Sequence, residues 1–267
     1  MPLKVRDIVN IMEDYAPVQL KESYDNVGLM VGDSATEVTK ILIALDCTIK
    51  VIDEAIKCGC NLIITHHPLL FKKPASITMN TLQGKKIIKL IKNNINLYAS
   101  HTNLDSTPNG INEIIMEILD LDKSETLDTS AINCQAGIGR IATLDETITL
   151  EELIHRVKLK LKIQSLRYCG DEGKIINKVA VINGSGEDYI ALAIKRGADC
   201  IITGDTTYHY ISDYNEEGIA IIDAGHFDTE WPAMKAVGDI VNKGVKLLGL
   251  NISIIISKNT INPYKFK

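Results

Sequence analysis

Histidines that could bind metal ions follow an apolar, strand-like segment in the first half of the chain. His66 and His67 come directly after residues 62–65 and before Pro68, which removes a backbone donor where a strand must stop. Adjacent side chains of an extended chain point in opposite directions, so this pair is better suited to give one nitrogen to each of two ions than to hold one ion. The alternative is two histidines that form ordinary hydrogen bonds in a loop.

A histidine and a carboxylate follow a similar segment in the second half. His226 and Glu230 come after residues 219–223, and a helix that starts near Phe227 would bring both to one side of its first turn. A carboxylate there could bridge two cations, whereas the alternative is a capping histidine beside a solvent-facing glutamate. Asp105 supplies a second hard anionic ligand. Imidazoles with two carboxylates suit zinc, manganese, iron or cobalt better than calcium.

The two halves repeat one another around these residues. Residues 38–65 align without a gap with residues 176–203, and both segments contain Ala-Ile-Lys, then Gly, then Ile-Ile-Thr. Placing residues 99–101 on residues 224–226 brings Asp105 onto Glu230. Duplicated folds tend to arrange matching strand ends around a shared pseudo-twofold axis, so we expect a polynuclear metal site in a cleft between two similar domains.

Strand-like and helical patterns alternate along the chain, which indicates an α/β fold. The expected strands cover residues 41–45, 61–65, 96–100, 178–182, 200–203, 219–223 and the apolar run 247–256, and the expected helices include residues 50–57, 82–93 and 111–119. The polar stretch 122–130 is the best candidate boundary. It predicts a first α/β domain over residues 1–125 and a second over residues 126–267, with a C-terminal segment that can pack back on the first.

Composition limits the classes of function. The chain has 267 residues, 45% hydrophobic and 24% charged, and a formal net charge of −5 without a basic tail, which argues against nonspecific nucleic-acid binding. Small molecules or proteins are the expected partners. The first residues form a charged amphipathic pattern, and no run of about 18 apolar residues occurs, so we expect a cytoplasmic protein. The six scattered cysteines are expected to be reduced thiols.

Four more polar residues follow the same strand-like segments: His101, Asp205, Tyr208 and His209. They could orient metal ligands or transfer protons, and the alternative is a loop hydrogen bond. We take His101 and His209 as the candidate catalytic residues. The Gly184-Ser185-Gly186 turn could meet a phosphate but is more typical of a tight turn.

Five motifs in order, SYDNVGLMVG, IITHHPLLF, YASHTNLD, ITGDTTYH and DAGHFDTE, resemble those of the GTP cyclohydrolase type 2 homologue family, the Nif-three-like proteins with a dinuclear metal centre. The resemblance covers nearly the whole chain. It implies two similar α/β domains with the metal site in the cleft between them, and a toroidal homohexamer built as a trimer of dimers. The metal ligands that it implies, with Glu230 touching both ions, are His66, His67, Asp105, His226 and Glu230.

The expected activity is that of a dinuclear metal-dependent hydrolase. Two divalent ions and two carboxylates leave a net positive site, which favours a phosphorylated substrate, and a water bridging the ions would ionise near neutral pH. The resulting hydroxide would attack the imidazole ring of GTP or a phosphoester, with His101 or His209 moving protons. The alternative is a non-catalytic metal-binding hexameric scaffold, or an adaptor for a protein partner.

Overall fold

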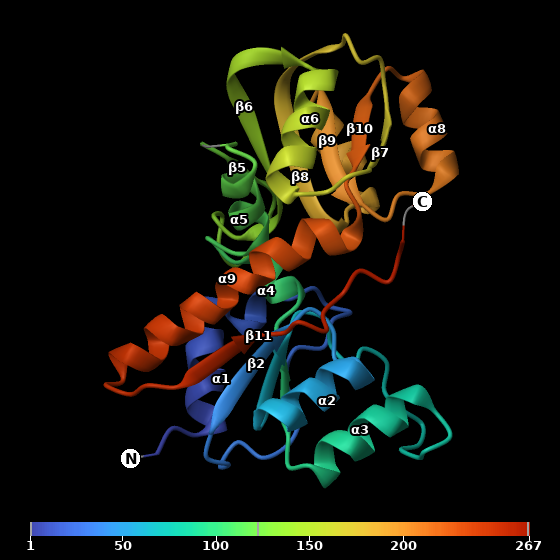
Figure 1. Ribbon diagram of the computed structural model, residues 1–267. Coiled ribbons are helices and arrows are strands. Elements are labelled where there is room, and N and C mark those ends of the chain that lie inside the picture. The colour runs from blue at the N-terminus through green and yellow to red at the C-terminus, as the bar shows by residue number, and fades with distance from the viewer. Residues whose placement is uncertain (1, 122, 266) are drawn as a thin grey trace. The chain divides into compact units, whose positions relative to one another are not determined.

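The computed structural model describes residues 2–121, 123–265 and 267, which form two compact units (Figure 1). The first unit comprises Met1–Leu104 and Met234–Ile261, and the second comprises Asp105–Ala233 and Asn262–Lys267. Two helices, α4 (Thr102–Ser106) and α9 (His226–Leu247), have residues in both units. The division precedes the one predicted after residue 125, because α5 (Ile111–Ile118) is tied to the second unit. The Asn112 side-chain amide donates to the Asp105 carbonyl, and the Asn183 amide donates to Asn112 Oδ1.

The first unit is built on a five-stranded sheet in the order β1-β4-β3-β2-β11. The strands β2, β3, β4 and β11 are parallel, and β1 pairs antiparallel with β4. The elements of this unit are α1 (Val5–Tyr15), η1 (Val18–Leu20), β1 (Gly28–Val31), β2 (Lys40–Ala44), α2 (Ile49–Cys58), β3 (Leu62–Thr65), α3 (Leu82–Lys92), β4 (Asn96–Ala99) and β11 (Ser253–Ile256).

Helices cover both faces of this sheet, which explains why its inner strands are continuous apolar runs. On one face Leu42 and Ile63 pack with α2 and α3. On the other, Ile43 and Ile256 lie against Gly238 of α9, and Gly244 of the same helix lies against Ile11 of α1.

The second unit is built on a six-stranded sheet in the order β5-β6-β8-β9-β10-β7. Its three parallel strands are β8, β9 and β10, and the remaining strands pair antiparallel. Besides α5, its elements are β5 (Glu125–Thr129), β6 (Gly137–Thr149), α6 (Leu150–Leu161), β7 (Arg167–Cys169), β8 (Ile175–Ser185), η2 (Glu187–Tyr189), α7 (Ile190–Lys195), β9 (Cys200–Gly204), α8 (Tyr208–Glu216) and β10 (Ala220–Asp223).

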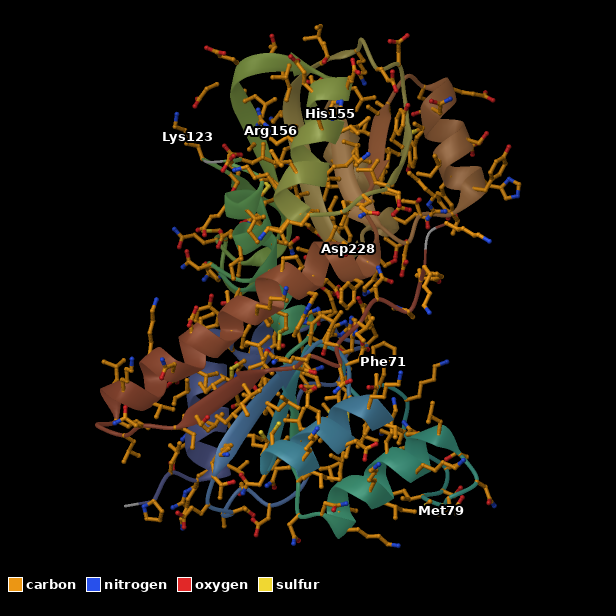
Figure 2. The ribbon with its side chains drawn as sticks, viewed as in Figure 1. Phe71, Met79, Lys123, His155, Arg156 and Asp228 are labelled. Atoms are coloured by element: carbon orange, nitrogen blue, oxygen red, sulfur yellow. The ribbon has the colours of Figure 1, made fainter. Side chains whose placement is uncertain are left out.

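Helix α6 begins with a capping box. Thr149 Oγ1 accepts from the Glu152 amide at 3.2 Å, and a Glu152 carboxylate oxygen accepts from the Thr149 amide at 2.7 Å. His155 is exposed on this helix (Figure 2). It therefore serves below as a surface control.

The internal repeat has one strand register in both sheets. Ile41 pairs with Leu62 in the first unit, and Val179 pairs with Cys200 in the second, as the gapless alignment of residues 38–65 with residues 176–203 requires. The next strands correct the alignment by one residue. Ala99 pairs with Thr65 where Asp223 pairs with Thr203, so Ala99 corresponds to Asp223 rather than to Ala224. The apparent match of Ala-Ser-His with Ala-Gly-His is therefore out of register.

The C-terminal region departs from its prediction in one respect. The apolar run 247–256 is not one strand, because α9 continues to Leu247 and the chain turns at Gly249, which has a φ of +73°. The strand β11 forms only afterwards and pairs parallel with β2, so this part of the chain belongs to the first unit. Within the predicted boundary 122–130, Asp122 lies outside the described residues and residues 125–129 form β5. No helix among the described residues is long and apolar enough to cross a membrane.

Candidate metal centre

Three histidines of the first unit converge at the carboxyl ends of β3 and β4. The imidazole nitrogens that His66, His67 and His101 offer to an ion lie within 4.8 Å of one another. The parallel pairing of Thr65 with Ala99 explains this, because the residues that follow the two strands emerge at the same edge of the sheet. The chain bends at His66 and His67, so their rings do not diverge as in an extended strand, and their centroids are 5.1 Å apart.

Each of these rings is oriented through its Nδ1 atom. His66 Nδ1 donates to the Ser100 carbonyl, His67 Nδ1 bonds to Asp46 Oδ1, and His101 Nδ1 bonds to Asp25 Oδ1, each at 2.9 Å. A histidine that binds a metal through Nε2 is typically held in this way by a carbonyl or carboxylate, which fixes the tautomer and raises ligand basicity. The three side chains are thus arranged to present Nε2 lone pairs.

Asp25 has a role that the sequence alone did not reveal, since its segment reads as a turn before a strand. Its side chain is buried and accepts from the Thr102 amide at 3.0 Å and the Thr102 hydroxyl at 2.5 Å, besides its bond to His101. Burial by itself would raise the pKa of Asp25, but the hydrogen bonds from His101 and Thr102 outweigh it and hold the pKa well below its usual range. Asp25 is therefore a carboxylate that orients His101. Its place in the motif SYDNVGLMVG was the available signal.

The second unit contributes a histidine and a glutamate on the first turn of α9, which begins at His226. His226 Nε2 lies 3.1 Å from Glu230 Oε2, as their spacing of four predicts. The other ring nitrogen, Nδ1, bonds to Asp205 Oδ2 at 2.7 Å. His226 is therefore oriented in the same way as the three histidines of the first unit, and Glu230, only 3% exposed, is a buried carboxylate beside it.

The end of strand β8, which includes Asn183 and Gly184, supports both carboxylates of the second unit. Asn183 Nδ2 donates to Asp105 Oδ1 at 2.9 Å. Gly184 has a φ of +61°, and a Cβ atom there would lie 2.2 Å from Glu230 Oε1, so only glycine leaves room for the carboxylate. Its amide donates to Thr229 Oγ1 at 2.9 Å. The end of β8 therefore helps to position Asp105 and Glu230. The sequence pattern predicted a tight turn at Gly184 and Ser185, but both residues belong to the strand.

His209 stands apart from the other predicted site residues. It lies exposed on α8 with its ring edge-to-face on that of Tyr208, at a centroid distance of 5.4 Å. Within the described part of the chain it belongs to no group of three side chains that could hold an ion. The cysteines are also outside the site. All six are free thiols, and burial raises the pKa of Cys47 to about 12 and that of Cys60 to about 11, so these two are unreactive.

The donor atoms of each unit suit divalent transition metals. The first unit offers neutral imidazole nitrogens, and the second offers an imidazole nitrogen and carboxylate oxygens. Zinc, manganese, iron and cobalt accept such mixed nitrogen and oxygen sets, whereas calcium prefers oxygen ligands alone.

Two α/β units, with histidine and carboxylate groups at their strand ends that could hold a metal ion, define the class of protein with which the chain is compared. The chain belongs to the DUF34/NIF3 family (NGG1p interacting factor 3), whose profile matches residues 3–263. This confirms both the resemblance drawn from the five motifs and the α/β fold class.

Relatives agree over their full lengths. A protein of Clostridium acetobutylicum named GTP cyclohydrolase 1 type 2 homolog is 59% identical over 269 residues, covering 100% of both chains. A protein of the same name from Clostridium perfringens is 51% identical over 264 residues, covering 99% of this chain and 100% of its own. The crystal structure of a Staphylococcus aureus hypothetical protein superimposes with a TM-score of 0.94 at 31% identity, covering 100% of both chains.

Proposed function

We propose that the protein is a metal-dependent hydrolase that acts on a nucleotide or another phosphorylated small molecule. Two divalent ions per chain would be held by the predicted ligands, which are His66, His67, Asp105, His226 and Glu230. The observation that carries the proposal is the convergence of three imidazoles in the first unit, each oriented through Nδ1. The names of the clostridial relatives support a nucleotide as the substrate class.

His101 is the proposed proton-transfer residue. Its Nδ1 atom bonds to the buried Asp25 carboxylate, which fixes the ring, and its side chain is 20% exposed, so Nε2 can reach a substrate. When bound, divalent ions lower the pKa of water toward neutrality and so supply a nucleophile. Four ionic charges against two carboxylates favour an anionic substrate. His209 is the second candidate for proton transfer.

An activity assay with matched histidine variants tests this proposal. Protein loaded with zinc or manganese is expected to release product from GTP or a phosphoester, and chelation is expected to abolish the release. His101→Asn should lower kcat by about 10²–10⁴-fold, the usual contribution of a general acid or base, without loss of metal. His155→Asn, at the exposed position on α6, should have no effect. Full turnover by metal-free protein would refute a metal-dependent hydrolase.

The same experiment addresses the scaffold alternative. Protein that binds two ions per chain and hydrolyses neither GTP nor a panel of phosphoesters would favour the non-catalytic metal-binding scaffold. The homohexamer implied by the resemblance is part of this proposal, and the molecular mass in solution tests it.

A further inference from the structure

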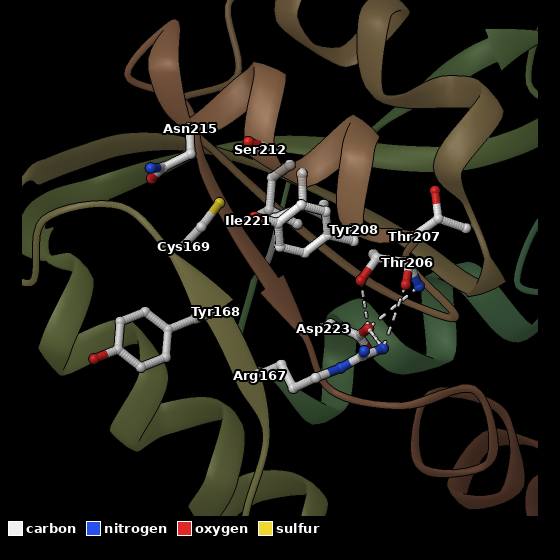
Figure 3. Close-up of a pocket in the computed structure, with 11 residues that line it drawn as sticks. Arg167, Tyr168, Cys169, Thr206, Thr207, Tyr208, Ser212, Asn215, Ile221 and Asp223 are labelled. Atoms are coloured by element: carbon white, nitrogen blue, oxygen red, sulfur yellow. Dashed lines mark hydrogen bonds and ion pairs between the residues drawn. The ribbon is translucent and has the colours of Figure 1, made fainter.

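A pocket of about 390 Å³ lies in the second unit, between helix α8 and the strand pair β7–β10 (Figure 3). This volume is in the range of small-molecule binding sites. Its lining combines an apolar floor with neutral polar groups and one ion pair. The lining includes Arg167, Cys169, Tyr208, Ser212, Asn215 and Asp223.

The pocket remains because α8 packs against the core of the unit only through partly buried residues, Ile211 and Tyr214. Positions 208, 211, 212 and 215 form one face of the helix, with the spacing at which a packed helix carries apolar residues. Here Ser212 and Asn215 occupy two of these positions, and no residue of α8 is buried. By contrast, α7 in the same unit buries Ile190 and Ala193. The gap therefore results from Ser212 and Asn215, because apolar side chains at these positions would fill the space between the helix and the sheet.

The floor comes from paired residues of β7 and β10. Cys169 lies opposite Ile221, and Arg167 lies opposite Asp223, so all four side chains share one face of the sheet. Tyr168 alternates to the other face, and Figure 3 shows its ring pointing away from the rest of the lining. The aromatic side chain available to a ligand is therefore Tyr208, which is 79% exposed.

One end of the pocket is polar but electrically neutral. Arg167 Nη2 forms an ion pair with Asp223 and donates to the Thr206 carbonyl at 3.5 Å. Asp223, 5% exposed, also accepts from the Thr206 amide and hydroxyl at 3.2 and 2.6 Å. Next to it, the Thr207 hydroxyl donates to Glu187 at 2.6 Å. Arg167 therefore offers donors without a net positive charge, because Asp223 cancels it and Glu187 adds a negative charge nearby.

We propose that this pocket binds a nucleoside, that is, a neutral planar heteroaromatic ring carrying hydroxyl groups. The base would stack on Tyr208 over the floor of Cys169 and Ile221, since stacking on an aromatic ring requires only a flat partner. The Asn215 amide and the Ser212 hydroxyl can each donate and accept along its edge. The sugar hydroxyls would bond at the Arg167–Asp223 end. In the view of Figure 3, Asn215 and this ion pair lie at opposite ends of the pocket.

The lining disfavours two other classes of ligand. A polyphosphate would meet an arginine already neutralised by Asp223, so no net attraction remains. A purely apolar chain would leave Asn215, Ser212 and Arg167 with their hydrogen-bonding groups covered and unsatisfied, which is costly.

This binding is separate from the proposed hydrolytic function and requires no metal. The pocket nevertheless adjoins the loops that carry His226. Asp223 Oδ1 accepts from the Gly225 amide at 3.0 Å, immediately before His226, and Asp205, which orients His226, immediately precedes Thr206. A ligand at the Arg167–Asp223 end would contact Asp223, whose hydrogen bonds fix the backbone at Thr206 and Gly225.

Titration of chelator-treated, full-length protein with guanosine tests the proposal, with binding measured by calorimetry and by chemical shifts. Guanosine is expected to bind, GTP to bind no more tightly, and inorganic phosphate not to compete. Tyr208→Ala should weaken guanosine binding at least about fivefold, the range of base stacking. Tyr210→Ala, on the same helix and outside the lining, is the control and should leave the affinity unchanged.

A second variant separates loss of the pocket from loss of folding. Ser212→Leu places an apolar side chain in the gap, so guanosine binding should disappear while the melting temperature stays the same or rises. Glu230→Ala should retain guanosine binding, whatever its effect on metal content or hydrolysis. The proposal is overturned if guanosine fails to bind, if Tyr208→Ala and Ser212→Leu bind it like the wild type, or if Glu230→Ala alone abolishes binding.

Discussion

The two units share a strand–helix–strand register but carry different chemistry at their strand ends. In the first unit three imidazoles converge, and carboxylates orient two of them, through Asp25 and Asp46. In the second unit Glu230 lies beside a single histidine, and the buried Asp105 carboxylate accepts from Asn183. The repeated strands therefore end at corresponding edges of the two sheets, but the side chains that follow them differ. The first unit offers imidazole nitrogens, and the second offers an imidazole nitrogen and a buried carboxylate.

The halves also differ in how their ligands are supported. Each histidine of the first unit is oriented by a single hydrogen bond at Nδ1. The carboxylates of the second unit depend instead on the backbone conformation at Asn183 and Gly184 and on the buried contacts of Arg140. This contrast predicts large, structural effects for changes in the second unit and smaller, ligand-tuning effects in the first.

The largest effect is expected for Arg140→Met in the second unit. The Arg140 side chain is fully buried, pairs with Glu113 at 3.1 Å, and donates to the carbonyls of Gly137, Gly139 and Thr107. Arg140→Met leaves the three carbonyl groups without this donor, at about 1–3 kcal/mol of unfolding free energy for each unsatisfied group, and leaves the 25% exposed Glu113 without its partner. Urea denaturation measures this loss. A change below about 1 kcal/mol would show that the contacts of Arg140 do not stabilise the second unit.

Gly184→Ala should remove metal binding with a smaller loss of stability. A Cβ atom at 2.2 Å from Glu230 Oε1 forces the carboxylate out of place, so metal affinity should fall more than about a hundredfold. Loss of a residue that only orients a ligand typically costs about 10–100-fold.

Gly197→Ala is the matched control for that variant. Gly197 also has a positive φ, +82°, but a Cβ there meets no atom within 4 Å. It should lose about 1–2 kcal/mol of stability through backbone strain and keep full metal affinity. Equal metal affinity in the two variants would remove the proposed role of Gly184.

Asp25→Asn tests the weaker support of the first unit. The variant keeps the shape of the side chain but removes the charge that orients His101, so kcat should drop about 10–100-fold while the metal stays bound. Metal titration and kcat, compared with Asp53→Asn at an exposed ion pair on α2, measure the effect. Wild-type values for Asp25→Asn would show that His101 is oriented without this carboxylate.

The last prediction concerns Glu54, which lies outside the candidate metal groups and should make the unfolding free energy depend on pH. Glu54 accepts from the Ser257 hydroxyl at 2.6 Å and from the amides of Lys258 and Asn259 at 2.9 and 3.1 Å. Burial would raise the pKa of Glu54, but these bonds prevail and lower it. Its contribution is therefore present above the unfolded pKa of about 4.3 and is lost as pH falls through the lower folded pKa.

Glu54→Gln should accordingly cost about 1–3 kcal/mol of unfolding free energy at pH 7, and the difference from the wild type should shrink as the folded pKa is passed. Urea denaturation across this pH range provides the measurement, with the exposed Glu37→Gln as control. A difference that stays constant with pH would contradict the role of the ionised carboxylate.

The sequence predicted the parts of the site that follow from strand patterns. His66, His67 and His101 were placed at one sheet edge because their strands are apolar runs buried on both faces, and His226 and Glu230 were paired by helical spacing. These signals are local, so they survive without tertiary information.

Contacts between distant segments could not be predicted in this way. Asp25 reaches His101 across 76 positions, and Asn183 reaches Asp105 across 78, so neither partner is visible in a local pattern. The register error at Ala99 has the same origin, since strand pairing and not residue identity decides which positions correspond.

The measurement that tests the central claim most directly is metal content per chain, by elemental analysis of protein purified without chelators. The wild type is compared with His67→Ala in the first unit and Glu230→Ala in the second. If both units contribute to one dinuclear centre, the wild type holds two ions per chain and each variant loses metal. Two ions retained in Glu230→Ala, or a wild type without metal, would contradict the account.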